Sequence, residues 1–342
     1  MDLVETGEVR LLYLDPFQTY LVPHTLRNFH NSLDFQRKIF EWTPHEKSTV
    51  ILTDLSDYGN AGAGASPYNG VSVFIAPASR TLETMPSSER MFMIMNHELV
   101  HVANMDVASS KDQRWRKFFG GKPRQSDSHP ESILYNYLTV PRLSSPRWYL
   151  EGAATFMETW MSGGTGRAQG PFDEMVFRAK VRDDAYFYSH LGIVSEGVAI
   201  DFLAGVNAYL YGTRFISYLA YEYSPQHVID WLQRGEDSER YYSKQFQKVF
   251  DKSLEDAWND WIAFEHEFQE ANLAALRQFP LTETEPLTGQ TLGSVSRSYV
   301  DEERREMIGA FRYPGVVAHV GRFSLDTGEV EHVTDIKGPM TY

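Results

Sequence analysis

Apolar positions in the first eighty residues alternate between the spacing of strands and that of a helix. Residues 9–22 (VRLLYLDPFQTYLV) cluster and alternate apolar side chains as strands do, and STVILTDL and VSVFIAP are short strand-like runs. One helical face collects the apolar residues that follow the first run: Leu26, Phe29, Leu33 and Phe40, with Ile39 beside them. The Gly- and Ala-rich residues 56–70 predict a loop. This order predicts a β-α-β-β lobe with a small mixed sheet.

Helical spacing dominates from Pro86 onward. Ser87 can cap a helix that has Glu89 in its first turn and runs to about Asn104, and Pro146 introduces a second helix, RWYLEGAATFMETWM. The stretch from about 106 to 146 is polar, and GGKPRQSDSHPES within it predicts a loop. From about 206 to 278 nearly every segment has helical spacing. We therefore predict an α-helical second lobe and an α+β fold.

The pattern changes again near the C-terminus. Residues 280–298 lose the periodicity and gather Pro, Thr, Gly and Ser, and strand-like runs follow with a turn at Asp326-Thr327-Gly328. We expect three parts: a domain over 1–278, a linker over 279–298 and a β-strand tail over 299–342.

The amino-acid composition excludes some classes of partner and metal ligand. The chain has 342 residues with 46 acidic and 32 basic side chains. The formal charge of -14 would repel phosphate backbones and anionic lipid surfaces over much of the exterior, so nucleic acid is disfavoured as a partner. It has no cysteine, so a bound metal must be held by imidazole and carboxylate. No stretch approaches the roughly 18 apolar residues of a membrane span, and the N-terminus lacks a basic start followed by an apolar core.

One apolar segment, MFMIMNHELVHVANMD, carries metal-ligand chemistry. Residues four apart share a helical face, so His97 and His101 can direct both imidazoles at one ion. Glu98, beside them, can reach a metal-bound water as a general base. A catalytic zinc takes three protein ligands, and the candidates for the third are Glu151, Asp106 and His129.

The segment around Glu151 resembles the W-x-x-E-G-x-A helix of the gluzincin metallopeptidases. Trp148, Glu151, Gly152 and Ala154 match that motif position by position. The resemblance implies a zincin-like domain with one zinc bound by His97, His101 and Glu151. The link of about 50 residues between His101 and Glu151 is longer than in the best-known aminopeptidases, and the polar insert accounts for it.

The same resemblance assigns further residues. Glu158, two turns beyond Glu151, would orient a ligand histidine, and Tyr209 in a Y-x-x-G helix start would stabilise the oxyanion, with Tyr211 and His190 as alternatives. An edge strand over Val71 to Ile75 would accept an extended peptide substrate. Its substrate-binding residues would be Gly70, Val71 and Val73.

The C-terminal SLDTGEVEHVTD resembles the opening blade of a TolB-like β-propeller. One blade leaves strand edges unpaired, so we expect the natural protein to continue past Tyr342. The whole pattern is similar to a peptidase MA-like domain fused to such a propeller, which implies zinc-dependent hydrolysis of a peptide or protein in the bacterial periplasm or cell envelope. The alternative is a non-catalytic zinc-containing scaffold that recruits a partner protein through the propeller.

Overall fold

The computed structural model of the chain describes residues 1–55, 59–76, 89–196, 203–289, 293–295, 298–313 and 315–336. The chain divides into two compact units, Met1–Ala274 and Ala275–Tyr342. The first unit combines a small sheet with a large set of helices, and the second is a β unit. The α+β class and the C-terminal β tail predicted from the sequence are confirmed.

A five-stranded mixed sheet opens the first unit. Its strands are β1 (Asp2–Glu5), β2 (Val9–Tyr13), β3 (Ser48–Thr53), β4 (Asn60–Gly64) and β5 (Gly70–Phe74), in the spatial order β1-β2-β3-β5-β4. The inner pairs are parallel and the two outer pairs are antiparallel. β4 lies where the sequence predicts a loop. Its residues, NAGAG, have little strand preference of their own, and pairing with β5 provides the strand.

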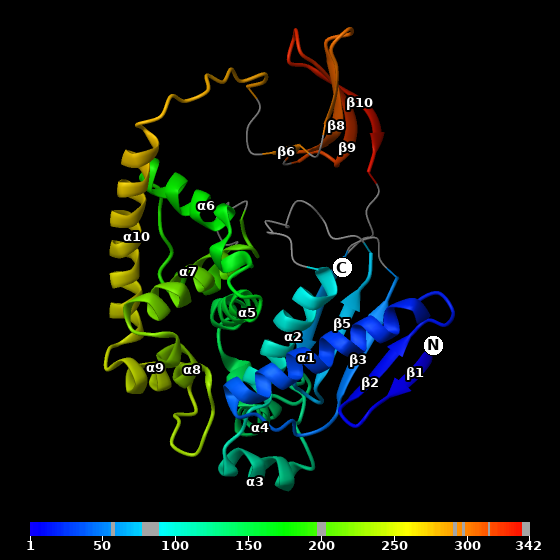
Figure 1. Cartoon of the computed structure of the whole chain (residues 1–342), viewed down its shortest axis with the longest axis vertical. Coiled ribbons are helices and arrows are strands. Elements are labelled where there is room, and N and C mark those ends of the chain that lie inside the picture. Colours follow the sequence, from blue (N-terminus) through cyan, green and yellow to red (C-terminus); the bar gives the residue numbers. More distant parts are fainter. Residues whose placement is uncertain are drawn as a thin grey trace. The chain divides into compact units, whose positions relative to one another are not determined.

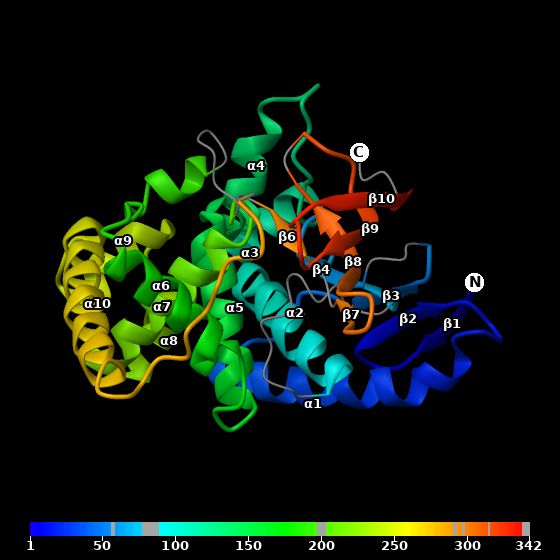
Figure 2. The ribbon, with the colours of Figure 1, turned by 90° about the horizontal axis from the view of Figure 1, so that it is seen from above.

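Two helices, α1 (Val22–Phe40) and α2 (Arg90–Asp106), pack side by side on one face of this sheet (Figures 1 and 2). That face is apolar because alternate strand residues, such as Val50 and Leu52, are buried there. The predicted cap Ser87 lies outside the described residues. Glu89 is the N-cap of α2 and not part of its first turn, since its carboxylate accepts hydrogen bonds from the Met91 and Phe92 amides.

The remaining helices form the α-helical lobe of the first unit. They are α3 (Ser110–Phe119), α4 (Ser132–Thr139), α5 (Arg147–Met161), α6 (Pro171–Arg182), α7 (Asn207–Glu222), α8 (Pro225–Leu232), α9 (Tyr242–Phe250) and α10 (Leu254–Leu276), with 3-10 turns at Thr19–Leu21, Pro141–Ser144, Arg167–Gln169 and Gly192–Ser195. The sequence pattern did not predict α3, α4 or α6. α3 and α4 bury mainly polar side chains, so they lack an apolar stripe. No described helix is both long and apolar enough to cross a membrane.

Two glycines set the contact between α5 and α7. A Cβ built on Gly152 would come within 2.4 Å of the Gly212 backbone, and one on Gly212 would come within 2.0 Å of the Trp148 carbonyl oxygen. These separations are too short for any side chain, so the two helix backbones approach directly. The contact fixes the N-terminal halves of both helices, which carry Glu151 and Tyr209, against each other.

Large aromatic side chains fill the core beside this contact. Trp148 packs against Trp258 with ring centroids 4.9 Å apart, and Phe215 packs against Trp258 at 4.8 Å. Trp231 and Trp261 are fully buried in the same cluster. Burial of several rings of this size provides much of the stability of the helical lobe.

The second unit holds an antiparallel sheet. Its strands are β6 (Ser294–Val295), β7 (Tyr299–Asp301), β8 (Glu306–Arg312), β9 (His319–Ser324) and β10 (Val330–Asp335). The order is β10-β9-β8-β6, and β7 also pairs with β8. Phe311 and Phe323 are its buried aromatic residues, and Gly328 takes φ 72° in the predicted turn between β9 and β10. The propeller stays a prediction.

Candidate metal centre

Two ligand residues of the candidate centre, both histidines, project from the same face of α2. His97 and His101 are one helical turn apart, and their Nε2 atoms lie 3.2 Å from each other. Both side chains are buried, as is almost every residue of α2 from Ile94 to Asp106, because the helix packs against α1, α5 and the sheet. The imidazoles therefore meet inside the protein.

α5 brings a carboxylate to the same point. Glu151 Oε2 lies 3.3 Å from His97 Nε2 and 3.2 Å from His101 Nε2. The three residues form a group whose ligand atoms all lie within 4.8 Å of one another. The grouping of His97, His101 and Glu151 that the sequence predicts is thus present in the structure.

The dimensions of this group fit a tetrahedral metal ion. Zinc holds nitrogen and oxygen ligands at about 2.0–2.2 Å, so two ligands of a tetrahedral ion lie about 3.3 Å apart. The three separations here, 3.2, 3.2 and 3.3 Å, match one triangular face of such a tetrahedron. Two imidazoles and one carboxylate are also the ligand types of a catalytic zinc site.

Glu158 fixes the ring of His97 from behind. Its Oε2 lies 2.7 Å from His97 Nδ1, so Nδ1 carries a proton and donates a hydrogen bond to the carboxylate. In the neutral ring that a metal ligand requires, the free lone pair is therefore on Nε2, which faces His101 and Glu151. A carboxylate that orients a ligand histidine in this way is typical of zinc sites.

Arg167 is a contributor that the sequence analysis did not identify. Its Nε and Nη2 donate to both carboxylate oxygens of Glu158 at 2.7 Å, and Nη2 is also 2.7 Å from His97 Nδ1. Since Nη2 and the protonated Nδ1 are both donors, Glu158 is the acceptor that they share. The loop that carries Arg167 folds tightly on α5, where the Ala168 amide donates to Thr159 Oγ1. Nothing in the sequence GTGRAQG signals this role.

Charge in the cluster favours a cation. Burial disfavours the charged forms, but hydrogen bonds to Glu151 and Glu158 outweigh it and raise the pKa of His97 to about 9. Hydrogen bonds from the two histidines hold the pKa of Glu151 well below its usual range, again against burial. Burial raises the pKa of Glu98, with the histidines opposing the shift. A raised pKa suits a carboxylate that must accept a proton near neutral pH.

Tyr209 lies over the centre, and the two alternatives do not. Its ring stacks on His97 with centroids 6.2 Å apart, and the guanidinium groups of Arg147 and Arg167 lie 5.3 and 5.4 Å from the centroid of the Tyr209 ring. Burial and the charge of Glu151 raise the pKa of Tyr209, so the phenol stays protonated. Tyr211 instead packs in the aromatic core against Phe177 and the α10 tryptophans. The His190 carbonyl accepts a hydrogen bond from Trp148 Nε1.

The competing third ligands lie in other surroundings. Asp106 is buried at the end of α2, where its oxygens accept hydrogen bonds from Trp42, Asn69, Arg116 and Lys122 among others. These donors already occupy the carboxylate. The side chain of His129 is 71% exposed in the loop before α4. Neither residue belongs to the metal-ligand group.

The predicted substrate edge is wrong in one respect. β5, which holds Gly70, Val71 and Val73, is not an edge strand, because β3 pairs with one side of it and β4 with the other. Val71 and Val73 are each 1% exposed and pack in the core. Among the described strands β4 is the edge on this side of the sheet, and its glycines have open space around them. The error follows from reading residues 56–70 as a loop.

The fold and the site together define an α+β protein with a buried His-His-Glu group that could hold a metal ion. No protein-family model and no curated protein sequence matches the chain. Among solved structures, it is similar to an aminopeptidase N family protein from Idiomarina loihiensis, with 12% identity and a TM-score of 0.31. The match covers 82% of this chain and 44% of that one, so this chain spans less than half of that protein. At this TM-score the likeness carries no argument about function.

Proposed function

We propose that this protein is a zinc-dependent peptidase that hydrolyses peptide bonds. The observation that carries the proposal is the triangle of His97, His101 and Glu151 ligand atoms, 3.2 to 3.3 Å apart, with a glutamate directly beside the first histidine in the chain. This arrangement supports a metal that keeps an open position for water. Glu98 is not needed to complete the ligand triangle, so its presence beside the ligands supports catalysis over a structural role.

The residues divide the chemistry among themselves. Bound zinc would polarise the scissile carbonyl and lower the pKa of the attacking water. Glu98 takes a proton from that water and then gives it to the leaving amine. The proposal is supported by the burial of Glu98 and by its raised pKa, which lets one carboxyl act first as base and then as acid.

Tyr209 and Glu158 have supporting roles in this proposal. The phenol of Tyr209 donates a hydrogen bond to the oxyanion that forms as water adds to the carbonyl. Arg147 interacts with Tyr209 by a hydrogen bond; when the guanidinium donates to the phenol oxygen, the phenol keeps its own proton for this purpose. Glu158, itself held by Arg167, keeps the lone pair of His97 Nε2 directed at the ligand triangle.

Metal analysis together with cleavage of casein or a peptide library tests the proposal. The wild-type protein is expected to hold one zinc per chain and to cleave peptide. Glu98→Gln keeps the metal and loses roughly 10²-fold or more in rate, because the amide cannot accept the proton. Glu151→Ala loses the zinc. Glu267→Gln, an exposed glutamate of α10, is the matched control and should change neither quantity.

Two results would contradict the proposal. Cleavage by Glu98→Gln at the wild-type rate would remove the general base from the mechanism. Full zinc occupancy without cleavage of any peptide by the wild-type protein would instead favour the non-catalytic scaffold.

A further inference from the structure

Helices α3 and α4, at the bottom of the first unit in Figure 1, carry exposed apolar side chains. Phe118 is 75% exposed, Trp115 is 37% exposed and Leu134 is 56% exposed. The aromatic rings form a chain of contacts: Trp115 lies 6.0 Å from Phe118, Phe118 lies 5.0 Å from Phe119, and Phe119 packs on Tyr135 of α4 at 4.8 Å. Leu134 is next to Tyr135 in the chain. Exposed side chains of this size, gathered at one place, mark an interaction site more often than isolated ones do.

Basic side chains share this surface. Lys111, Trp115 and Phe118 follow the i, i+4, i+7 spacing of one helical face, and Arg114 lies one turn from Phe118 on the same side. Among residues 110–139, all of which the structure describes, the exposed charged side chains other than histidine are four basic and two acidic. They are Lys111, Arg114, Lys117 and Arg124, against Asp127 and Glu131. One exposed carboxylate from outside this segment, Glu236, accepts hydrogen bonds from Ser110 at the start of α3. Helix α3 itself exposes three cations and no anion on a chain of net charge -14.

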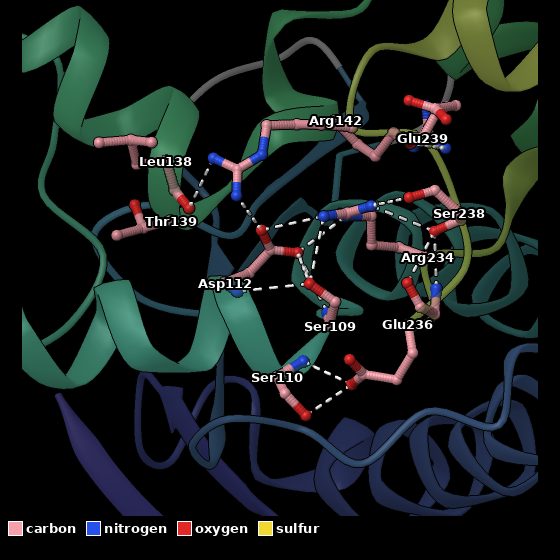
Figure 3. A network of polar contacts seen from close by, with 12 residues as sticks. Ser109, Ser110, Asp112, Leu138, Thr139, Arg142, Arg234, Glu236, Ser238 and Glu239 are labelled. Carbon is pink, nitrogen blue, oxygen red and sulfur yellow. Dashed lines mark hydrogen bonds and ion pairs between the residues drawn. The ribbon is translucent and has the colours of Figure 1, made fainter.

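The opposite face of α3 holds the helix in place. Asp112 accepts hydrogen bonds from Arg234 and Arg240, in the polar network of Figure 3, and Ser109 caps the helix in a capping box with Asp112. Arg116 is buried and pairs with Asp106. The buried charged side chains of α3 are therefore all paired. Among the lysines and arginines of residues 107–146, all of which the structure describes, Arg116 and Lys122 form ion pairs. Arg114 interacts electrostatically with Glu236, whereas Lys111 and Lys117 form no ion pair with a described residue.

We propose that this basic aromatic surface, formed by Lys111, Arg114, Trp115, Lys117, Phe118 and Leu134, docks on an anionic lipid bilayer. Trp and Phe insert at the boundary between headgroups and acyl chains, while Lys and Arg stay at the level of the headgroups. A lipid surface is favoured because the apolar groups lie on exposed faces of short helices, and a bilayer requires no complementary shape. A nucleic acid would need a longer track of cations, which the acidic exterior does not offer.

Sedimentation with vesicles tests this docking on the full chain. The probes are vesicles of phosphatidylcholine alone and of phosphatidylcholine mixed with phosphatidylglycerol. We expect binding to the mixed vesicles only, and its loss at high salt, because each Lys or Arg near an anionic surface strengthens binding roughly fivefold. The double variant Lys111→Glu with Arg114→Glu should weaken binding at least roughly tenfold. Phe118→Ser should also weaken it clearly.

The substituted side chains are exposed, so the variants should fold like the wild-type protein. Lys111, Arg114 and Phe118 are all exposed, and circular dichroism and zinc content should match the wild-type protein. The control is Phe17→Ser, which removes an aromatic side chain that is 78% exposed and follows Asp15-Pro16 in the chain. This variant should bind vesicles like the wild-type protein. Absence of binding to the mixed vesicles overturns the proposal, as does unchanged binding by Phe118→Ser. A dimer in solution that Phe118→Ser dissociates would also overturn it, in favour of contact between two copies of this chain.

Discussion

His97 uses both of its ring nitrogens, and this explains why the centre needs more than three residues. Nε2 faces the other two ligands while Nδ1 donates to Glu158. Glu158 is buried and would be costly to ionise without a partner, and the guanidinium of Arg167 provides one, which helps to hold the pKa of Glu158 low. Glu158 and Arg167 thus support His97 on its Nδ1 side, opposite the nitrogen that would hold a metal.

Only part of this arrangement could be predicted from the sequence. Helix periodicity alone brings His97 and His101 together, because residues four apart must share a face. Glu151 and Glu158 required a motif, since their distance from His97 depends on how α5 packs on α2. Arg167 lies in a loop, where no periodicity relates it to any partner, so only the folded chain reveals its contact with Glu158.

Tyr209→Phe tests the oxyanion role at the scale of one oxygen atom. We expect kcat to fall roughly 10²-fold with KM and zinc content nearly unchanged, because the phenol would act only on the transition state. Tyr211→Phe is the matched control: its hydroxyl accepts a hydrogen bond from the Tyr188 amide in the core, so it should cost about 1 kcal/mol of stability and leave kcat intact. The opposite pattern in the two variants would move the role to Tyr211.

Asp173 predicts a pH dependence of stability. It is buried in the first turn of α6, and burial raises its pKa to about 7, against the pull of Arg167 and Arg214. The folded protein therefore holds this proton more tightly than the unfolded chain, so the contribution is present at low pH and is lost as the pH rises from about 4 through about 7. The difference in free energy of unfolding between Asp173→Asn and the wild type should therefore be roughly 1–3 kcal/mol more favourable to the variant at pH 8 than at pH 5.

Urea unfolding at the two pH values, with a chelator present throughout, measures this difference. Asp127→Asn, in an exposed loop, is the control and should show no such change between the two conditions. An equal effect of Asp173→Asn at pH 5 and pH 8 would mean that the carboxyl does not titrate in this range.

At the scale of elements, the crossing of α5 and α7 decides where the site residues stand. Gly152 and Gly212 let the two backbones touch, which sets Glu151 against the α2 histidines and Tyr209 above them. Both glycines belong to the motifs noted in the sequence, W-x-x-E-G-x-A and Y-x-x-G. The structure gives them a packing role that the motif itself does not explain.

Gly212→Ala should separate these helices. The added methyl would lie 2.0 Å from the Trp148 carbonyl oxygen, a backbone atom that cannot swing away. We expect a loss of roughly 1–3 kcal/mol in the free energy of unfolding and a weaker affinity for zinc. Gly235→Ala, where a Cβ meets nothing within 4 Å, is the control. Unchanged stability and zinc affinity in Gly212→Ala would show that the crossing tolerates a wider separation.

Elements with strong apolar periodicity were predicted well, and those without it were not. α5 begins at Arg147, directly after Pro146, as the sequence indicates. α3 buries Asp112 and Arg116, and these charged side chains are stable in the core because they pair with residues elsewhere in the chain. Arg234, for example, donates a hydrogen bond to Asp112. β4 depends on its neighbour for strand structure. For α3 the stabilising contacts are distant in sequence, and for β4 they are backbone hydrogen bonds to the next strand, so in neither case do the element's own residues show a pattern.

At the scale of the whole molecule, the division into units makes a prediction about proteolysis. The first unit ends near Ala274, within the last turn of α10, and the described residues from 277 to 289 are almost all exposed and form no helix or strand. Glu283 lies in this segment and is followed by Thr284, whereas Glu285 is followed by Pro286 and its bond resists cleavage. A protease that cuts after glutamate should therefore make its first cuts there.

The fragment that remains should be a folded zinc protein. Its apolar core, from the sheet to the α10 tryptophans, lies wholly within Met1–Ala274, and all three ligand residues belong to that unit. We expect the product ending at Glu283 to keep one zinc and to melt within a few degrees of the intact chain, since the cut removes none of those contacts. Glu98→Gln is the form to digest, because self-cleavage would otherwise add fragments of its own. If cleavage after Glu283 released the zinc or unfolded the product, the β tail would have to contribute to the stability of the first unit, and the predicted division of the chain would be wrong.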